Sequence, residues 1–343
     1  MRAIGLGVIV LACLSGCTDD SEPPLLFGYS LDETLRLNHL RMKGTHNSYH
    51  VAPNPKKLDE WDYTHAPLAR QLEEQGVRQF ELDIHYRARE KRFLVYHLPG
   101  DDGSTCATLG ACLGELMEWS NGHRGHHPIV VFLEPKDDID AAEDAIAGRY
   151  ADLDREILAA WPRKRVLVPD DVKGSHRTLA EAVRNSGWPT LGELRGKALF
   201  VLLDSDHGEG SHHYGYTHGA KSLDGRAMFV TATSEDPYAA VLSLDDPIGD
   251  AQAITAAARQ NFLVRTRAND PVKDGKASTR AELEASVNGD AHMISTDFPS
   301  PGGIDNYWLD VGGAPSSCHP SLAPAGCTAS EVESPDRLQP LSR

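Results

Sequence analysis

Short apolar runs rich in β-branched or aromatic residues recur along the chain, and stretches with helical spacing separate them. The pattern predicts eight strands, at residues 40–45, 79–85, 93–97, 129–134, 198–204, 227–231, 262–267 and 292–297. It predicts helices at residues 67–75, 109–120, 138–160, 175–185, 248–260 and 280–287. Strands that alternate with helices form a parallel sheet, and eight such strands close a barrel. We therefore expect an α/β fold, in which a single catalytic domain forms a distorted (β/α)8 TIM-type barrel.

Polar residues stand at the ends of the first four predicted strands. In a barrel of parallel strands, reactive side chains come from the carboxyl ends of several strands, which meet at one mouth. In strand order, the residues at these ends are His46 and Asn47, Glu81 and Asp83, His97, and Glu134. This placement predicts an active site at that mouth.

The acidic residues of this set predict a metal site. Glu81 and Asp83 are two residues apart on a strand, so both side chains point to the barrel interior. Enclosed carboxylates repel each other unless a cation or a proton lies between them. Glu134 adds a third carboxylate and Asn47 a carboxamide oxygen, and such an all-oxygen set favours Ca²⁺ over Zn²⁺. Mg²⁺ usually prefers fewer protein ligands and more water. The alternative is that these acids are surface charges or partners of basic residues.

Two histidines complete the predicted site. His46 and His97 each end a predicted strand, and two imidazoles beside a metal can divide the general base and general acid roles near neutral pH. Five other histidines are expected in loops or at solvated positions: His123, His126, His127, His212 and His213.

Four further residues are weaker candidates for substrate binding. Lys136 lies two residues beyond Glu134 and could contact a phosphate, or be an ordinary surface lysine. Arg265 and Arg267 share one strand face and could clamp the substrate, or pair with interior carboxylates. His85 shares a face with the two strand carboxylates, where we expect it to form part of the pocket wall.

The first residues predict an export signal. Arg2 is followed by a short apolar run, Ile4–Leu14, which is too brief to span a bilayer. The run ends in Leu14-Ser15-Gly16-Cys17, which resembles the lipobox of bacterial lipoproteins, in which the cysteine carries lipid. An ordinary secretory signal cleaved near Gly16 is the alternative. We expect a membrane-anchored lipoprotein of a bacterial cell envelope, or otherwise a secreted protein.

These signals divide the chain into four segments. We expect a signal peptide at residues 1–16, a lipidated cysteine and tether at 17–35, the barrel at 36–312, and a C-terminal tail held by a disulfide at 313–343. The membrane would be a partner only through the N-terminal lipid, and we expect the protein to be a monomer.

The remaining cysteines fit an oxidising compartment. Apart from Cys13 and Cys17, the chain has an even number of them: Cys106, Cys112, Cys318 and Cys327. An even count in an exported protein suggests two disulfides. We favour pairing of neighbours, Cys106 with Cys112 and Cys318 with Cys327, over the two other connectivities. A zinc site is the competing interpretation, but no Cys-x-x-Cys pair supports it.

The charge balance excludes one class of partner. The chain has 34 Lys and Arg against 50 Asp and Glu, a net charge of −16. Nucleic-acid binding normally depends on a basic stripe, so we expect no nucleic-acid partner.

The ordered motifs resemble those of a known enzyme family. Gly44-Thr45-His46-Asn47-Ser48-Tyr49, then Glu81-Leu82-Asp83, Tyr96-His97 and Phe132-Leu133-Glu134 resemble the catalytic X region of phosphoinositide-specific phospholipases C. They are most similar to the Ca²⁺-dependent bacterial branch. Later matching segments are residues 169–172, 187–191, 195–197, 264–268 and 295–299, so the likeness runs from about residue 38 to residue 299.

The resemblance implies a role for each matching residue. Asn47, Glu81, Asp83 and Glu134 would bind Ca²⁺. His46 would take the proton from the inositol 2-hydroxyl, whose oxygen attacks the phosphorus, and His97 would protonate the departing diacylglycerol. The products would be diacylglycerol and inositol 1,2-cyclic phosphate, which is then hydrolysed slowly to inositol phosphate. Related phosphodiesters could also serve as substrate.

Two other functions remain open from the sequence. A glycerophosphodiester phosphodiesterase shares a barrel, a Glu-x-Asp pair and two histidines, although such enzymes usually have His-Arg where this chain has His46-Asn47. A non-catalytic lipoprotein that binds lipid head groups is the second, but the chain keeps both histidines and all four ligand candidates.

Overall fold

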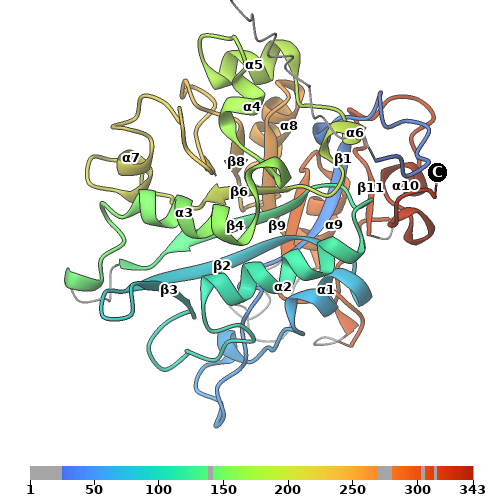
Figure 1. Cartoon of the computed structure of the whole chain (residues 1–343). Coiled ribbons are helices and arrows are strands. Elements are labelled where there is room, and N and C mark those ends of the chain that lie inside the picture. Colours follow the sequence, from blue (N-terminus) through green and yellow to red (C-terminus); the bar gives the residue numbers. More distant parts are fainter. Residues whose placement is uncertain (1–24, 138–141, 269–279, 303–305, 313–314, 343) are drawn as a thin grey trace, which may run out of the picture.

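The computed structural model describes residues 25–137, 142–268, 280–302, 306–312 and 315–342 (Figure 1). The predicted signal peptide and Cys17 lie outside the described residues. The strands are β1 Leu40–Thr45, β2 Val77–Arg87, β3 Arg92–Val95, β4 Ile129–Pro135, β5 Val166–Leu167, β6 Ala198–Leu202, β7 Phe229–Val230, β8 Val241–Ser243, β9 Leu263–Arg267, β10 Met293–Thr296 and β11 Ser316–Cys318. The α-helices are α1 Leu68–Glu74, α2 Leu109–Gly122, α3 Tyr150–Ala160, α4 Pro169–Lys173, α5 Leu179–Ser186, α6 Leu191–Leu194, α7 His212–Tyr216, α8 Ala251–Arg259, α9 Arg280–Asn288 and α10 Ala329–Val332.

Parallel strands curl into a distorted barrel. One run of pairings joins β1, β2, β4 and β6, and another joins β1, β10, β9 and β8. The short strand β7 pairs with β6, and a single parallel bridge between Thr231 and Val241 connects it to β8. The pairings therefore form a closed ring of eight parallel strands. The ring has its fewest backbone pairings between β7 and β8, where a single bridge closes it. The predicted fold class is confirmed.

One predicted barrel strand is wrong and one was missed. Residues 92–95 form β3, which pairs antiparallel with the outer half of β2, with Ile84 opposite Val95. Strand β2 runs for 11 residues, so it extends past the barrel mouth and its end is free to form this hairpin. The missed strand is β8, whose three residues are too few for a strand pattern to stand out in the sequence. The expected number of eight barrel strands is still correct, because β8 takes the place that was predicted for residues 93–97.

The helix predicted over residues 138–160 is shorter than expected. Helix α3 begins at Tyr150, and a 3₁₀ turn covers Ala142–Asp144. Residues 138–141 are not among the described residues. Gly148 has a φ of +79°, a left-handed conformation that interrupts a right-handed helix and that glycine adopts at little cost. The other five predicted helices are present within a few residues of their expected ends.

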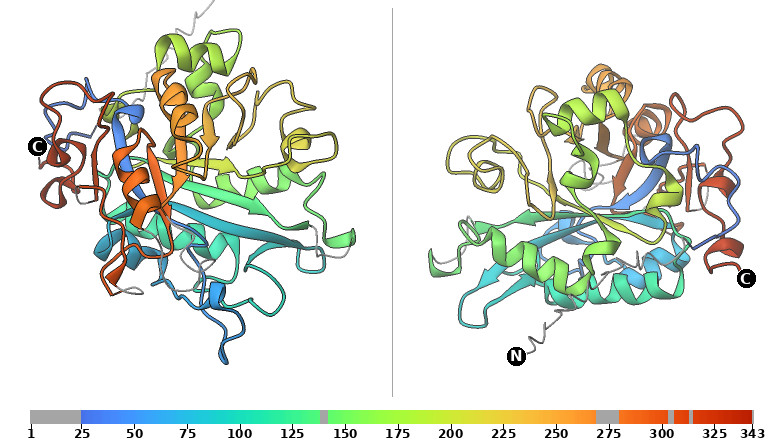
Figure 2. Two further views of the ribbon diagram at one scale, coloured as in Figure 1. Left: turned by 180° about the vertical axis from the view of Figure 1, so that it is seen from behind. Right: turned by 45° about the horizontal axis from the view of Figure 1, so that its top comes forward.

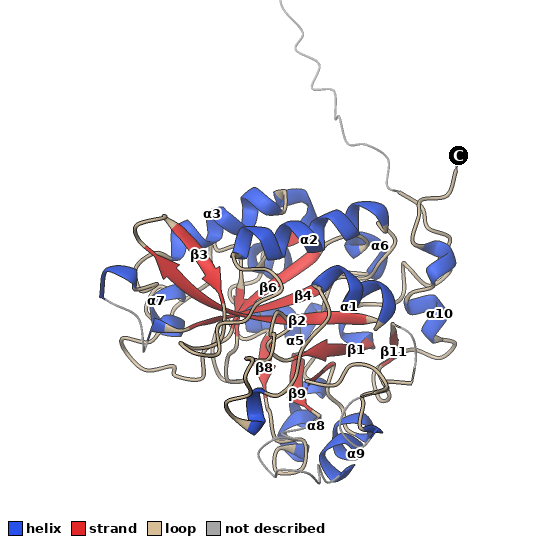
Figure 3. Cartoon of the chain, turned by 90° about the horizontal axis from the view of Figure 1, so that it is seen from below, coloured by secondary structure: helices blue, strands red, loops and turns tan. Residues whose placement is uncertain are grey.

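Helices pack around the outside of the barrel. Figure 3 shows α1, α2 and α3 on one side of the strands and α8 and α9 on the opposite side. Helices therefore cover the outer faces of the strands and the barrel interior buries their inner faces, and every residue of β4 from Ile129 to Leu133 is buried. Such continuous apolar runs are typical of parallel sheets under helices. None of the described helices is long and apolar enough to cross a membrane.

The C-terminal tail packs against the amino-terminal side of the barrel. Strand β11 pairs antiparallel with β1, and the tail lies beside the first described residues, at one edge of the molecule (Figure 2). The Arg78 guanidinium of β2 forms a buried ion pair with Glu333 of the tail, which also accepts the backbone N–H of His127 at 3.0 Å. Both predicted disulfides, Cys106–Cys112 and Cys318–Cys327, are present.

Candidate active site

Strands β2 and β4 place three carboxylates side by side. Glu81 and Asp83 are both buried, as expected for alternate residues facing the barrel interior. The register of the two strands sets Asp83 directly opposite Glu134. One carboxylate oxygen from each of the three residues lies within 4.8 Å of the other two.

The loop after β1 brings in the amide and the first histidine. Ser48 fastens this loop to β2, because its hydroxyl accepts the N–H of Glu81 at 2.8 Å and its own N–H donates to the Glu81 carbonyl at 2.9 Å. The Thr45 hydroxyl donates to Ser48 Oγ at 2.7 Å. Asn47 has a φ of +43°, in the left-handed region that asparagine tolerates better than most residues. This turn directs Asn47 into the buried side of the loop.

The buried oxygens of this cluster are suited to a hard cation. Asn47 Oδ1 and both carboxylate oxygens of Asp83 are buried and accept no hydrogen bond. Buried polar atoms without a partner are rare and costly in native proteins. A cluster of carboxylate and amide oxygens in which several have no hydrogen-bond partner fits Ca²⁺, whose ligands are oxygens. The residues present therefore fit the predicted cation.

Lys136 lies within the acidic cluster. Its Nζ lies 2.5 Å from Glu134 Oε1 and 3.3 Å from Asp83 Oδ2. Burial disfavours the charged form of this lysine, but Asp83 and Glu134 outweigh that effect and raise its pKa. Burial, followed by the charge of Glu134, raises the pKa of Asp83 well above its usual value despite Lys136. At Asp83, the lysine therefore does not fully offset the effects of burial and of the neighbouring carboxylate.

His46 is held by a carboxylate that follows β10, the neighbouring strand of β1. Its Nδ1 lies 2.9 Å from Asp297 Oδ1, and its Nε2 faces Glu81, with 3.6 Å to Oε1. Arg267 Nη2 lies 3.3 Å from the same Nδ1. Burial alone would raise the pKa of Asp297, but His46 and Arg267 hold it at about 2. The ionised Asp297 accepts Nδ1–H, so Nε2 carries the lone pair.

His97 is held in the same way by a different carboxylate. Its Nδ1 lies 2.7 Å from Asp101 Oδ2, while the other oxygen of Asp101 lies 2.8 Å from His50 Nε2. His50 Nδ1 contacts the Tyr63 carbonyl at 2.9 Å, which fixes the orientation of that ring. Burial would raise the pKa of Asp101, but the hydrogen bonds from His50 and His97 lower it. His97 does not end a barrel strand as predicted; it follows the β3 hairpin strand.

His85 forms part of the wall that supports His97. Its Nε2 contacts the backbone carbonyl of Tyr96 at 3.0 Å and that of His97 at 3.3 Å. Its ring stacks on Tyr96, with centroids 3.7 Å apart and planes 3° apart. These contacts make His85 a buried support of the Tyr96–His97 segment, and its place in the pocket wall stays a prediction.

The two arginines of β9 have different surroundings. Arg265 is buried and forms ion pairs with Glu81 and with Asp245, whose Oδ1 lies 2.9 Å from Nη1. The second of the two predicted interpretations, pairing with interior carboxylates, therefore describes Arg265. Arg267 contacts His46 and lines a cavity of about 580 Å³, together with Glu81, Glu134, Lys136, Asp245 and Arg265. The rest of the cavity's polar wall is formed by Asp137, Asp204, Ser205, Asp206, Gly210, Ser211 and His212.

Three of the histidines expected in loops or at solvated positions are buried. His126 and His127 lie at 0% exposure, where they contact the hydroxyls of Ser120 and Ser316. His213 is also fully buried, and both His212 and His213 belong to α7. His126 and His127 do lie in a loop as expected, between α2 and β4, but tertiary packing buries them.

Sequence reasoning missed the residues that orient the two histidines. Asp297 follows β10 directly, so the strand-end rule that identified the other site residues would also have found it. Asp101 lies in a loop four residues after His97, and no strand or helix pattern singles it out. Asp245, the partner of Arg265, follows the strand β8 that was itself missed.

A family model described as "Phosphoinositide phospholipase C, Ca²⁺-dependent" matches residues 35–94 and 87–311, most of the chain. Among curated sequences, none matches the chain significantly.

Solved structures of two bacterial enzymes resemble the described fold. A Ca²⁺-dependent phosphatidylinositol-specific phospholipase C from Streptomyces antibioticus is 21% identical, with a TM-score of 0.59, over 77% of this chain and 95% of that one. A calcium-dependent phosphoinositol-specific phospholipase C from Pseudomonas sp. is 19% identical, with a TM-score of 0.57, over 78% of this chain and 91% of that one. At these identities the likeness concerns the fold.

Proposed function

The chain belongs to the family of Ca²⁺-dependent phosphoinositide phospholipases C, and we propose that the buried oxygen cluster and the two carboxylate-held histidines perform its chemistry. The substrate class is a phosphoinositide and the cofactor is Ca²⁺. Family membership favours neither a glycerophosphodiester phosphodiesterase nor a non-catalytic lipid-binding protein.

Four residues would hold the Ca²⁺: Asn47, Glu81, Asp83 and Glu134. The observation that carries this proposal is the unpartnered buried oxygens of Asn47 and Asp83, together with the clustering of the Glu81, Asp83 and Glu134 carboxylates. When bound, the cation would lower the pKa of a substrate hydroxyl and offset negative charge on the phosphoryl oxygens. Glu81 is shared with Arg265, so this carboxylate is positioned from two sides.

His46 would act as the general base. Ionised Asp297 fixes the proton on Nδ1, which leaves the Nε2 lone pair on the side of Glu81 and the cluster. Nε2 would remove the proton from the inositol 2-hydroxyl while the oxygen forms a bond to phosphorus. Arg267, beside His46 and in the cavity wall, would bind a phosphoryl oxygen.

His97 would act as the general acid. Asp101 engages Nδ1 and leaves Nε2 available to deliver a proton. As the bond from phosphorus to the diacylglycerol oxygen breaks, His97 would protonate that oxygen. The first product would be inositol 1,2-cyclic phosphate, because the attacking oxygen belongs to the substrate itself.

Initial rates on a panel of substrates test the proposed function. Micellar phosphatidylinositol should be cleaved in Ca²⁺ and not in excess EGTA, whereas glycerophosphocholine, which lacks an inositol hydroxyl next to its phosphodiester, should not be cleaved. Replacing His46 or His97 by alanine should lower kcat by roughly 10²–10⁴-fold. His123→Ala, outside the site, is the matched control.

Undiminished activity in EGTA would exclude the metal role, and cleavage of glycerophosphocholine would favour the glycerophosphodiester alternative. Full activity of His46→Ala would exclude that residue as the base.

We also propose that Cys17 carries lipid and anchors the enzyme, as a monomer, to a bacterial cell envelope. The apolar run Ile4–Leu14 and the lipobox-like sequence before Cys17 support this. Mass spectrometry of the N-terminus should find diacylated Cys17 in the membrane fraction, and Cys17→Ser should release the protein. Light scattering of the released form should give the mass of one chain.

A further inference from the structure

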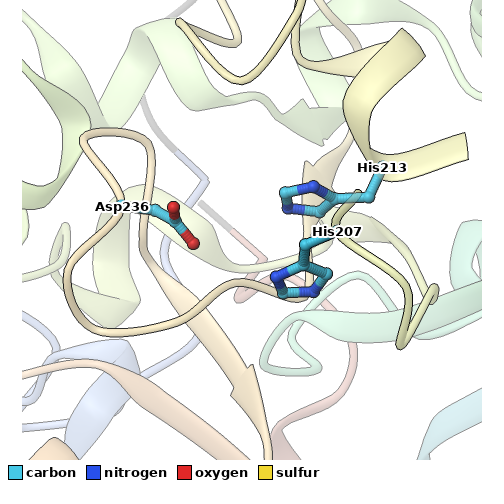
Figure 4. A group of neighbouring side chains, drawn as sticks. All are labelled: His207, His213 and Asp236. Atoms are coloured by element: carbon cyan, nitrogen blue, oxygen red, sulfur yellow. The ribbon is translucent and has the colours of Figure 1, made fainter. Parts of the chain in front are cut away.

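A second group of potential metal ligands lies next to the active-site cavity. His207 belongs to the loop after β6, His213 to helix α7, and Asp236 to the segment between β7 and β8. One ring nitrogen from each histidine and one oxygen of Asp236 lie within 4.8 Å of one another. Figure 4 shows that each histidine has a ring nitrogen on the side that faces the Asp236 carboxylate.

His213 is the unusual member of this group. Its side chain is fully buried, and neither Nδ1 nor Nε2 has a hydrogen-bond partner. The ring stacks against His207, with centroids 3.9 Å apart and planes 10° apart. A buried imidazole normally satisfies at least one nitrogen, because an unpaired buried polar group destabilises the fold. The structure therefore leaves both ring nitrogens of His213 without a hydrogen-bond partner, and one of them lies on the side of the Asp236 carboxylate.

The third member of the group is already oriented. Asp236 Oδ2 accepts the backbone N–H of Thr233 at 2.8 Å and its hydroxyl at 2.9 Å. Hydrogen bonds of this kind fix the orientation of metal-ligating carboxylates. Asp204 also lies beside the group, because its Oδ2 accepts the N–H of His213 at 3.0 Å. The added negative charge favours a cation at this place.

We propose that His207, His213 and Asp236 bind a transition-metal ion of the Zn²⁺ class, separate from the Ca²⁺ of the active site. Two imidazoles and one carboxylate are a donor set typical of Zn²⁺, and imidazole is a poor ligand for Ca²⁺. The Ca²⁺ cluster, by contrast, offers oxygen atoms only.

The position of the ion gives it a structural role. The loop that carries His207 and leads into α7 also carries Ser205, Asp206 and Ser211, which line the active-site cavity. Asp236 belongs to a different segment, between β7 and β8, where the single bridge from Thr231 to Val241 closes the barrel. A bound ion joins these two segments and holds one wall of the cavity in place.

Metal titration of the purified full-length protein tests this proposal. The protein is first stripped with a chelator, and Ca²⁺ is then added in excess to fill the active site. Co²⁺ and Zn²⁺ are titrated next, with the visible absorption of Co²⁺ and isothermal calorimetry as readouts. We expect one equivalent of Zn²⁺ per chain, a Co²⁺ spectrum of low coordination number, and a Zn²⁺-dependent rise in Tm.

Variants assign the site. Asp236→Asn keeps the shape of the side chain and should lose the bound equivalent and the Tm rise, and His207→Ala should do the same. His218→Asn replaces an exposed histidine just after α7 and should bind as the wild type does, as should Glu134→Gln from the Ca²⁺ cluster. Absence of a Zn²⁺ equivalent in the wild type would overturn the proposal. So would binding that survives Asp236→Asn and His207→Ala, or binding lost in Glu134→Gln alone.

Discussion

Asp83 is the residue on which the Ca²⁺ site depends most. It is fully buried, its oxygens accept no well-formed hydrogen bond although Lys136 Nζ lies 3.3 Å from Oδ2, and it faces a second carboxylate on the next strand. Without a cation, its ionised form is destabilised by burial and by Glu134. The same features that make it a ligand therefore weaken the metal-free fold.

Asp83→Asn should separate these two effects. We expect the variant to lose Ca²⁺ binding and at least 10²-fold of its activity. In EGTA its Tm should equal or exceed that of the wild type, because a buried carboxyl with a raised pKa has been replaced by a neutral amide. Scanning calorimetry with and without Ca²⁺ measures both changes.

Asp102→Asn serves as the control, since Asp102 is exposed and adjacent to the His97 loop. It should keep the Ca²⁺-dependent rise in Tm. If Asp83→Asn kept that rise too, Asp83 would not be a ligand.

Asp297 acts on the reaction through His46. In Asp297→Asn a neutral amide replaces the carboxylate that contacts His46 Nδ1. The imidazole then loses the charged hydrogen bond that fixes its tautomer. We expect kcat to fall by about 10³–10⁴-fold, while KM and the Ca²⁺ affinity stay close to wild type. A merely structural aspartate would instead lower Tm and leave the pH profile of kcat unchanged in shape.

Much of the site could be predicted residue by residue, but the residues that orient its histidines could not. Glu81 and Asp83 follow from strand alternation, and Glu134 follows from the end of a buried run. The partners Asp297 and His46 are 251 residues apart, and that proximity exists only once the barrel closes. The burial of His213 likewise depends on how α7 packs, which its sequence does not reveal.

At the scale of elements, the regular strands and helices were predictable and the departures from regularity were not. Strands β4 and β6 are continuous apolar runs, and α2 and α5 begin with threonine N-caps, Thr108 and Thr178. The β3 hairpin depends on how far β2 extends past its neighbours. The three-residue strand β8 is defined by its pairing with β9 and not by its own pattern.

Glu333 ties the C-terminal tail to the barrel, and its loss should destabilise the whole fold. It is buried against Arg78 and His127. Burial would raise the pKa of this carboxyl, but Arg78 and then His127 hold it at about 2, against 4.5 when unfolded. Glu333→Gln leaves Arg78 buried without its counter-charge, so we expect a loss of roughly 3–5 kcal/mol in the free energy of unfolding.

The Arg78–Glu333 pair should make the free energy of unfolding fall at acid pH. A carboxyl whose pKa is lowered on folding stabilises the protein above the unfolded pKa, and that contribution is lost as pH falls from 4.5 towards 2. The wild type should therefore lose roughly 3 kcal/mol more than Glu333→Gln over this window. Equal slopes for the two proteins in urea titrations would contradict the assignment.

At the scale of the whole molecule, buried neutral histidines should make the protein sensitive to mild acid. Burial lowers the pKa of His65 to about 4, of His126 to about 3 and of His127 to about 4. Below pH 6.5 the unfolded chain binds protons that the folded chain does not, so stability falls as pH drops from 6.5 towards 4. Each such histidine contributes on the order of 3 kcal/mol.

Urea denaturation at pH 7 and at pH 5 measures this loss. His126→Asn should reduce the difference between the two pH values, whereas His123→Asn, which alters a partly exposed histidine, should not. A stability that does not change between these pH values would mean that folding does not lower the pKa of the buried rings.

The most direct test of the central claim is the identity of the first product by ³¹P NMR, with purified enzyme and micellar phosphatidylinositol. The arrangement of His46, His97 and the oxygen cluster predicts that inositol 1,2-cyclic phosphate appears first, in Ca²⁺ and not in EGTA, with the monophosphate accumulating later. Monophosphate as the first product would mean that water attacks the phosphorus, and it would contradict His46 as the base that activates the inositol hydroxyl.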